Sequence, residues 1–379
     1  MTDYRKETVI KGQKRLRCGY TTGTCAAAAA KAAAAMLFSG EICREIRLTL
    51  PGGDRIMLEP VVLEMLPETV KCGIIKDAGD DPDITNGMMV CARIRKTEGK
   101  EIVIDGGEGV GRVTRAGLDQ PVGAAAINSV PRQMIRSALE EIKQTWHYAG
   151  GLSAIISIPG GAEKAAKTLN PVLGIEGGLS VLGTTGIVEP MSEQALVDTI
   201  AVDMRMHLAM QEQVFIMAPG NYGLDFLQEH YNISREQVIK ISNYIGESLD
   251  LAVCMGVSGI LMAGHIGKMI KIAGGIMNTH SRQADARMEI LTAYAALAGA
   301  GTQVLQCIMQ SATTDAGLDI LKEAGFLEPV MALVLEKIHM HMQRRAGDHV
   351  EIGVILFSNV YGLLGQTDNV ACLLAKRRP

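Results

Sequence analysis

The chain has 379 residues, a length that allows two domains of ordinary size. Apolar residues make up 47% and charged residues 21%, which is typical of a folded, enzyme-like protein, and the formal net charge is −4. This balance gives no global basic field and therefore no support for a nucleic-acid partner. Any anionic ligand has to be held by local arginines and lysines.

The cysteines and the apolar stretches indicate a cellular compartment. Eight cysteines are scattered along the chain, and no C-x-x-C pair predicts a zinc or redox site. Reduced thiols are the simplest interpretation. The N-terminal segment lacks the apolar core of a signal peptide, and no uninterrupted apolar stretch reaches the roughly 18 residues of a membrane span. We expect a soluble, cytoplasmic protein with no membrane partner.

The first part of the chain places short β-patterned segments between two long helices. We predict helices at 24–38 and 130–145, and strands at 45–50, 55–60, 69–76, 88–96 and 101–105. Neighbouring strands flanked by helices indicate an α+β layered domain, which we place at residues 1–170. A further strand at 152–158 could belong to either domain.

The first helix opens on two Thr-Gly pairs followed by alanines, in the sequence GYTTGTCAAAAAKAAAA. Thr22 or Thr24 is a natural N-cap, and alanine favours the helix while adding little volume. Such a helix start can hold an anion on free backbone N–H groups, and Arg17 stands just upstream. The alternative is a tightly packed alanine helix with an ordinary cap.

The next motif, KDAGDDPDITNG at residues 76–87, gathers aspartates such as Asp77 and Asp81 beside Lys76. A calcium loop that starts at Asp81 would need glycine at its sixth position, where Asn86 stands, so the calcium pattern fails. The segment is either a solvated, turn-rich loop or a site whose carboxylates orient a ligand's hydroxyl or ammonium groups.

The segment IVIDGGEGVGRVTRAGL, residues 102–118, first resembles a nucleotide-binding fingerprint. No helical pattern follows its glycines, so we reject a simple Rossmann motif at this point. Arg112 and Arg115 on the rim of the glycine loop can still clamp a carboxylate or a phosphate, because guanidinium groups pair bidentately with planar oxyanions.

The second part of the chain repeats strand, glycine turn and helix, which indicates a Rossmann-like, doubly wound α/β domain at residues 171–379. Ligands of open α/β sheets bind beyond the carboxyl ends of the strands. The turn from Gly183 to Gly186 is therefore our first choice for cofactor contact, and a plain connecting turn is the alternative. The expected strands are 179–183, 214–218, 259–263, 302–309 and 350–358, and the expected helices begin near 192, 223, 268 and 316.

Cationic side chains follow a later strand of this sheet. Lys268 lies at a predicted strand-to-helix junction, and Arg282 follows a glycine break. Both suit a substrate with several carboxylates. A single histidine in such a place is more often structural, so His265 and His280 rank below the charged residues.

Five of these stretches, in this order over nearly the full chain, resemble the cobalt-precorrin-5B C-1-methyltransferase family, CbiD. They are GYTTGTCAAAAAKAA, KDAGDDPDITNG, GEGVGRVTRAGL, NPVLGIEGGLSVLGTTGIVEPMS and GHIGKMIKIAGGIMNTHS. The resemblance implies methyl transfer from S-adenosylmethionine to ring carbon C-1 of cobalt-precorrin-5B, giving cobalt-precorrin-6A in anaerobic cobalamin biosynthesis. It also implies two domains, one of them Rossmann-like.

A flat, polycarboxylated macrocycle needs cations at its rim and small residues against its face. We therefore expect substrate contacts from Arg17, Thr21, Thr22, Gly23, Thr24, Lys76, Arg112, Arg115, Lys268 and Arg282. For the methyl donor we expect contacts from Gly177, Gly178, Gly183, Thr184, Thr185, Gly186 and Asp81. Asp77 and His265 are the candidates for catalysis. We expect no protein-bound metal, because the cobalt arrives inside the substrate.

The expected partner is the small corrinoid substrate, and channelling with other pathway enzymes and a homo-oligomer are further hypotheses. Two other classes of function stay open. A nicotinamide-dependent oxidoreductase would explain the α/β half, but no G-x-G-x-x-G follows a strand with an acidic residue about 20 positions on. A non-catalytic tetrapyrrole carrier would explain a glycine-lined, anion-binding cleft.

Overall fold

The protein is described here by a computed structural model that covers residues 8–168, 170, 171 and 173–376, so the first seven residues of the N-terminal segment lie outside it. The chain divides into two compact units, Met1–Ser192 and Glu193–Pro379. We expected the division between residues 170 and 171. It falls later because the segment that follows residue 171 supplies two strands to the first unit.

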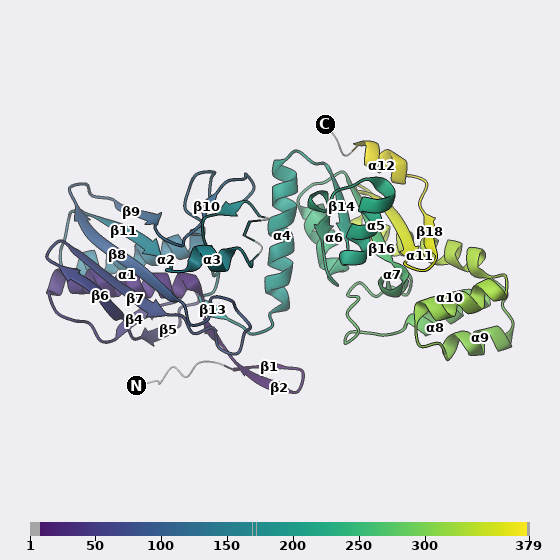
Figure 1. Ribbon diagram of the computed structural model, residues 1–379, viewed down its shortest axis with the longest axis horizontal. Coiled ribbons are helices and arrows are strands. Elements are labelled where there is room, and N and C mark those ends of the chain that lie inside the picture. The colour runs from purple at the N-terminus through teal and green to yellow at the C-terminus, as the bar shows by residue number, and fades with distance from the viewer. Residues whose placement is uncertain (1–7, 169, 172, 377–379) are drawn as a thin grey trace. The chain divides into compact units, whose positions relative to one another are not determined.

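Among the described residues, the strands of the first unit form one large sheet and four two-stranded ladders. They are β1 (Thr8–Lys11), β2 (Lys14–Arg17), β3 (Gly19–Tyr20), β4 (Ile46–Thr49), β5 (Arg55–Leu58), β6 (Val61–Leu66), β7 (Thr69–Ile75), β8 (Met89–Thr97), β9 (Ile102–Gly106), β10 (Arg112–Val113), β11 (Gly151–Ser157), β12 (Ile175–Glu176) and β13 (Ile187–Val188). The large sheet has the order β6-β7-β8-β11-β9 (Figure 1). Only β9 and β11 run parallel in it.

The helices of the first unit are α1 (Thr22–Ser39), α2 (Ser129–Thr145) and the short α3 (Gly161–Ala165). α1 packs against β7, β8 and α2 in one continuous core. All residues from 22 to 34 are buried. The thiol of Cys72 on β7 donates to the backbone carbonyl of Ala29 at 3.6 Å, so the strand lies directly against the helix. The alanine run is therefore core packing, the second of the two interpretations above.

The ends of α1 are capped within the chain. The Oγ1 atom of Thr21 accepts a hydrogen bond from the N–H of Thr24 at 3.2 Å, as an N-cap does. At the other end Gly40 adopts a φ of 72°, a conformation that glycine adopts without strain. The buried Lys31 donates to the carbonyl of Arg47 at 2.8 Å, which ties the middle of the helix to β4.

The second unit carries a second five-stranded sheet, in the order β15-β14-β16-β17-β18. Its strands are β14 (Val214–Ala218), β15 (Ile239–Lys240), β16 (Gly259–His265), β17 (Glu351–Ser358) and β18 (Gly362–Gln366). All neighbours are parallel except β17 and β18. The helices are α4 (Glu193–Ala209), α5 (Asn221–Tyr231), the 3-10 helix η1 (Arg235–Gln237), α6 (Ile245–Cys254), α7 (Ile266–Ala273), α8 (Arg287–Leu297), α9 (Thr302–Met309), α10 (Thr314–Glu323), α11 (Leu327–Ala346) and α12 (Val370–Lys376).

Both faces of this parallel sheet are covered by helices. On one face Phe226 of α5 stacks on Phe357 of β17, with ring centroids 4.1 Å apart, and α12 packs beside it. On the other face α6, α7 and α11 pack against alternate residues of the same strands. Strands buried on both sides explain the near-continuous apolar character that predicted them. The expected mixed α/β class is confirmed.

Two predicted strands are wrong. Residues 302–309 form α9, because Val304, Leu305 and Ile308 recur at helical spacing and a short apolar run does not distinguish helix from strand. Residues 179–183 form only isolated bridges, from Leu179 to Val110 and from Val181 to Ile127.

The packing of α1 predicts the effect of enlarging one of its alanines. Ala29→Leu places extra atoms against β7, and we expect the free energy of unfolding to fall by about 1–3 kcal/mol. Urea unfolding followed by circular dichroism measures the change. Ala162→Leu, at an exposed position of α3, is the control that should change little. Equal stability of the two variants would contradict the packing argument.

Candidate functional site

The first turn of α1 is bonded to a loop at residues 182–186. The N–H of Gly23 and the hydroxyl of Thr22 both donate to the carbonyl of Leu182, at 3.0 and 3.1 Å. The next two N–H groups of the helix donate to the side-chain and backbone oxygens of Thr21, at 3.2 and 3.1 Å. An anion site on these N–H groups was one of two interpretations of this helix start. The structure favours the other, an ordinary cap, because the chain itself supplies their acceptors.

Gly183 and Gly186 fit the loop closely against the helix. Gly183 has a φ of 139°, and a Cβ atom there would lie 2.3 Å from Oγ1 of Thr21. The hydroxyl of Thr24 donates to the carbonyl of Gly186 at 2.7 Å. These glycines, expected to contact the methyl donor, meet the threonines expected to contact the substrate. The two threonines between the glycines are exposed.

Arg17 and Asp77 form a two-pronged ion pair. Nη1 and Nη2 of the guanidinium donate to Oδ2 and Oδ1 of the carboxylate at 2.8 and 3.0 Å. The N–H of Gly79 also donates to Oδ1, at 2.9 Å. The Asp77 carboxylate thus accepts three hydrogen bonds, which fix its position. A substrate carboxylate would have to compete with Asp77 for Arg17.

Lys76 organises the 76–87 loop from inside. It is 2% exposed, and its ammonium contacts Asp83 and donates to the hydroxyl of Thr85 at 2.6 Å. Burial raises the pKa of Asp83, but the charge and hydrogen bond of Lys76 together with donors from Thr85 outweigh it, so that this pKa lies below its usual 3.8. We expected Lys76 at the rim of a substrate site. Its burial and its paired ammonium correct that expectation.

Asp81 and Gly178, two residues expected to contact the methyl donor, also have partners inside the first unit. Asp81 accepts a hydrogen bond from the N–H of Met191 at 3.0 Å. A Cβ atom on Gly178 would lie 2.4 Å from the carbonyl oxygen of Gly109, so two chain segments meet there at a distance that only glycine permits. Gly177, in contrast, is exposed and has open space at its Cβ position.

Arg112 is paired as well. Its guanidinium lies 2.9 Å from the carboxylate of Asp105 and donates to the carbonyl of Gly106 at 3.1 Å. Burial raises the pKa of Asp105, but hydrogen bonds from Arg112 and Gly106 outweigh it and hold this pKa below its usual value. Arg115 is exposed, and its stem lies beside Gly174, where a Cβ atom would be 2.5 Å from its Cγ.

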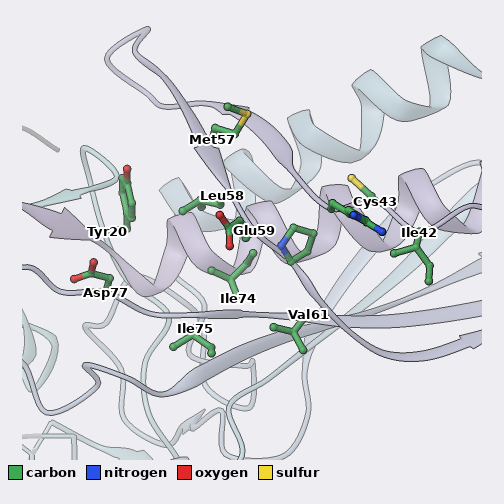
Figure 2. Close-up of a pocket in the computed structure, with 12 residues that line it drawn as sticks. Tyr20, Ile42, Cys43, Met57, Leu58, Glu59, Val61, Ile74, Ile75 and Asp77 are labelled. Atoms are coloured by element: carbon green, nitrogen blue, oxygen red, sulfur yellow. The ribbon is translucent and has the colours of Figure 1, made fainter. Parts of the chain in front are cut away.

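A cavity of about 590 Å³ opens in the first unit beside β5, β6 and β7 (Figure 2). Its walls are mainly apolar: Ile42, Met57, Leu58, Pro60, Val61, Ile74 and Ile75. Figure 2 shows Tyr20 and Asp77 at one end of the cavity, Ile42 and Cys43 toward the other, and Glu59 between them. Arg44 also lines the cavity.

In the second unit, Lys268 joins the carboxyl ends of neighbouring parallel strands. Its ammonium donates to the carbonyl of Pro219 at 2.6 Å and to that of Ser242 at 3.5 Å. Burial lowers the pKa of Lys268, and the nearby charges of Lys240 and Lys271 lower it further. The side chain thus ties the loops that follow β14 and β15.

His265 caps α7, because its Nδ1 atom accepts a hydrogen bond from the N–H of Gly267 at 3.0 Å. Burial lowers the pKa of His265, and the charge of Asp315 only partly offsets this, so the neutral ring is favoured. A capping role is the structural interpretation left open above. Arg282 is exposed in the loop before α8, where its N–H donates to Nδ1 of His280 at 3.1 Å.

The structure therefore gathers the expected residues into two separate groups. Arg17, Asp77 and residues 21–24 lie near one another in the first unit, and Lys268, His265 and Arg282 belong to the second. Within the described ranges no cluster of three or more metal-ligating side chains occurs. That the protein binds no metal of its own stays a prediction.

Of the residues that line the cavity, sequence reasoning singled out Asp77 and missed the others. Arg44, Met57 and Glu59 belong to none of the five motifs, and Tyr20 stands in the first motif without an assigned role. The available signal was the strand-breaking pair Glu59-Pro60 between two β-patterned runs, which places a turn where β5 passes into β6.

The comparisons with known proteins identify the family. The family model described as CbiD matches residues 9–190, and the model described as the CbiD C-terminal domain matches residues 278–368. The chain belongs to the CbiD family. A cobalt-precorrin-5B C(1)-methyltransferase of Ruminiclostridium cellulolyticum is 48% identical over 94% of this chain and 92% of its own length. The enzyme of the same name from Alkaliphilus metalliredigens is 43% identical over 97% of this chain and 96% of its own.

A solved structure from the same family was also matched. The crystal structure of a cobalamin biosynthesis protein (cbiD) from Archaeoglobus fulgidus is 26% identical, covers 74% of this chain and 87% of its own, and superposes with a TM-score of 0.40.

The contact between Lys76 and Asp83 predicts a pH-dependent stability. Asp83→Asn leaves a buried ammonium without its counter-charge, and we expect it to lower the free energy of unfolding at neutral pH by about 3 kcal/mol. The lowered pKa of Asp83 means that its stabilisation is complete above the unfolded value of 3.8 and is lost as the pH falls through the folded value. Urea unfolding at several pH values should show the wild type and the variant converging at acid pH, with the exposed Glu98→Gln as control. A gap that widens toward acid would contradict this assignment.

Replacing a glycine by alanine should lower the free energy of unfolding more at Gly183 than at Gly177. Gly183→Ala meets both a left-handed φ and the side chain of Thr21, so we expect a loss of about 3 kcal/mol or more. Gly177→Ala has a φ of 77° but open space, so only the backbone cost of roughly 1 kcal/mol should appear. Thermal unfolding of both variants provides the comparison. Similar melting temperatures would show that the loop does not pack on α1 as described.

Proposed function

We propose that this chain catalyses the transfer of a methyl group from S-adenosylmethionine to C-1 of cobalt-precorrin-5B, giving cobalt-precorrin-6A and S-adenosylhomocysteine. The observation that carries the proposal is the 48% identity with a cobalt-precorrin-5B C(1)-methyltransferase along 355 residues. Identity at this level extends over both units, so it is not the mark of one shared domain. The cobalt belongs to the substrate.

The reaction asks the protein mainly for positioning. A carbon of the electron-rich ring attacks the methyl carbon in line with the bond to sulfur, the new carbon–carbon bond forms, and the electrons of the broken bond stay on sulfur as a neutral thioether. The positive charge passes to the ring system. Holding the two reactants in a near-attack arrangement and excluding water can supply much of the acceleration.

The other two classes have less support. No Gly-x-Gly-x-x-Gly fingerprint follows a strand in this sequence, and the glycine loop at 106–111 is followed by the short β10 rather than by a helix. A tetrapyrrole carrier would share the binding requirements but not the close identity to named methyltransferases.

We further infer that the second unit is Rossmann-like in the broad sense. In chain order its strands are arranged 2-1-3-4-5, the order of one common doubly wound sheet, with helices on both faces. A cytoplasmic location, a homo-oligomer and channelling with neighbouring pathway enzymes stay predictions, as do the roles of Arg115 and Arg282 toward the substrate.

The direct test is transfer of label. Incubation of the purified protein with methyl-labelled S-adenosylmethionine and cobalt-precorrin-5B should place the label on the ring and release S-adenosylhomocysteine in equal amount, as read by mass spectrometry. A tetrapyrrole carrier would bind the ring without moving the label, and an oxidoreductase would respond to a nicotinamide nucleotide instead. Binding without transfer would overturn the proposed function.

A further inference from the structure

We propose that the cavity between Tyr20 and Ile42 is the site of the sulfonium methyl donor, and that the polycarboxylated macrocycle binds elsewhere. This assignment rests on the proposed function and goes beyond it, because it names the residues that receive one of the two substrates. It also replaces the expectation that the Gly183–Gly186 turn seats the donor, since that turn packs on α1.

The cavity has the size and lining of a small-molecule site. Its volume of about 590 Å³ falls within the range of roughly 300–1,000 Å³ that such sites occupy. Three of the apolar lining residues are largely exposed: Ile42 is 66%, Ile75 56% and Met57 49% exposed. Contact with the flat, weakly polar adenine of the donor would remove these apolar walls from water, which favours binding.

The charge of the lining decides between the two substrates. The charged side chains in it are one arginine, Arg44, and two carboxylates, Glu59 and Asp77. Asp77 is moreover paired with Arg17, which leaves no surplus of positive charge to attract a ring with many carboxylates. A sulfonium with an ammonium and a single carboxylate, in contrast, matches a lining that offers both signs.

The polar groups are distributed as such a donor requires. Tyr20 and Asp77 lie together at one end, and because Asp77 already holds the Arg17 guanidinium, the aromatic ring of Tyr20 is the group there that attracts a cation. Glu59 is exposed, lies midway along the cavity and, among the described residues, makes no hydrogen bond or ion pair with another side chain. Its carboxylate places a negative charge midway along the cavity, where it can attract the sulfonium of the donor.

The decisive experiment adds a positive charge to the lining of the cavity without altering the core. Ile75→Lys adds a cation at an exposed position in the lining, at the end of β7, and it should weaken binding of S-adenosylmethionine about tenfold or more, as measured by equilibrium dialysis. The matched control is Val103→Lys, which adds the same charge at a position 54% exposed on β9 of the same sheet, outside the cavity. The control should bind the donor as the wild type does.

A second pair of variants tests the carboxylate. Glu59→Gln should weaken S-adenosylmethionine more than S-adenosylhomocysteine, because the product is a thioether without the sulfonium charge. Glu68→Gln, an exposed glutamate in the turn after β6, should change neither affinity. An equal effect of Glu59→Gln on both ligands would contradict the claim that this carboxylate attracts the sulfonium charge.

The outcomes separate this proposal from the proposed function. If the wild type moves label from S-adenosylmethionine to the ring but Ile75→Lys binds the donor normally, the function stands and the cavity assignment is overturned. A lower KM for the corrinoid in Ile75→Lys would show that the anionic ring binds in the cavity, and this result would also overturn the assignment to the methyl donor. A change of oligomeric state on gel filtration with unchanged donor affinity would show instead that a second copy of the chain covers this face.

Discussion

The close packing of α1 on β7, β8 and α2 is the constraint on which the first unit depends. Only a side chain as small as alanine allows the helix backbone to come within 3.6 Å of the thiol of Cys72. The approach fixes where the helix begins, and the threonines of its first turn then fix the 182–186 loop by hydrogen bonds. One packing requirement thus accounts for a contact between residues more than 150 positions apart in the chain.

The same constraint changes the meaning of the motifs. A Thr-Gly turn ahead of an alanine helix has the chemistry of an anion site, but here its N–H groups and hydroxyls bond to the protein's own carbonyls. Lys76, Arg17 and Arg112 show the same pattern, each meeting a carboxylate of its own unit. Long motifs that identify a family can therefore describe the scaffold around a site as much as the site itself.

The sequence predicted well what local patterns control. Both long helices of the first unit, the buried strands β14, β16 and β17, and the mixed α/β class follow from periodicity, glycine turns and apolar runs. It predicted poorly what depends on distant partners. Residues 302–309 became α9 because a run of eight residues fits either element, and the division between the units moved because β12 and β13 pair with strands far earlier in the chain.

The cavity could not be predicted for a related reason. Met57 and Ile75 look like ordinary core positions, and their exposure follows only once the pairing of β5 with β4 and of β7 with its neighbours decides which face each side chain takes. The charge of a site is equally a property of the assembled structure. Counting arginines and lysines along the chain predicted a cationic clamp, whereas ion pairs cancel the charges of Arg17, Lys76 and Arg112 in place. The cavity beside β5, β6 and β7 is near-neutral and apolar, and under our proposal its ligand is the one that carries its own positive charge.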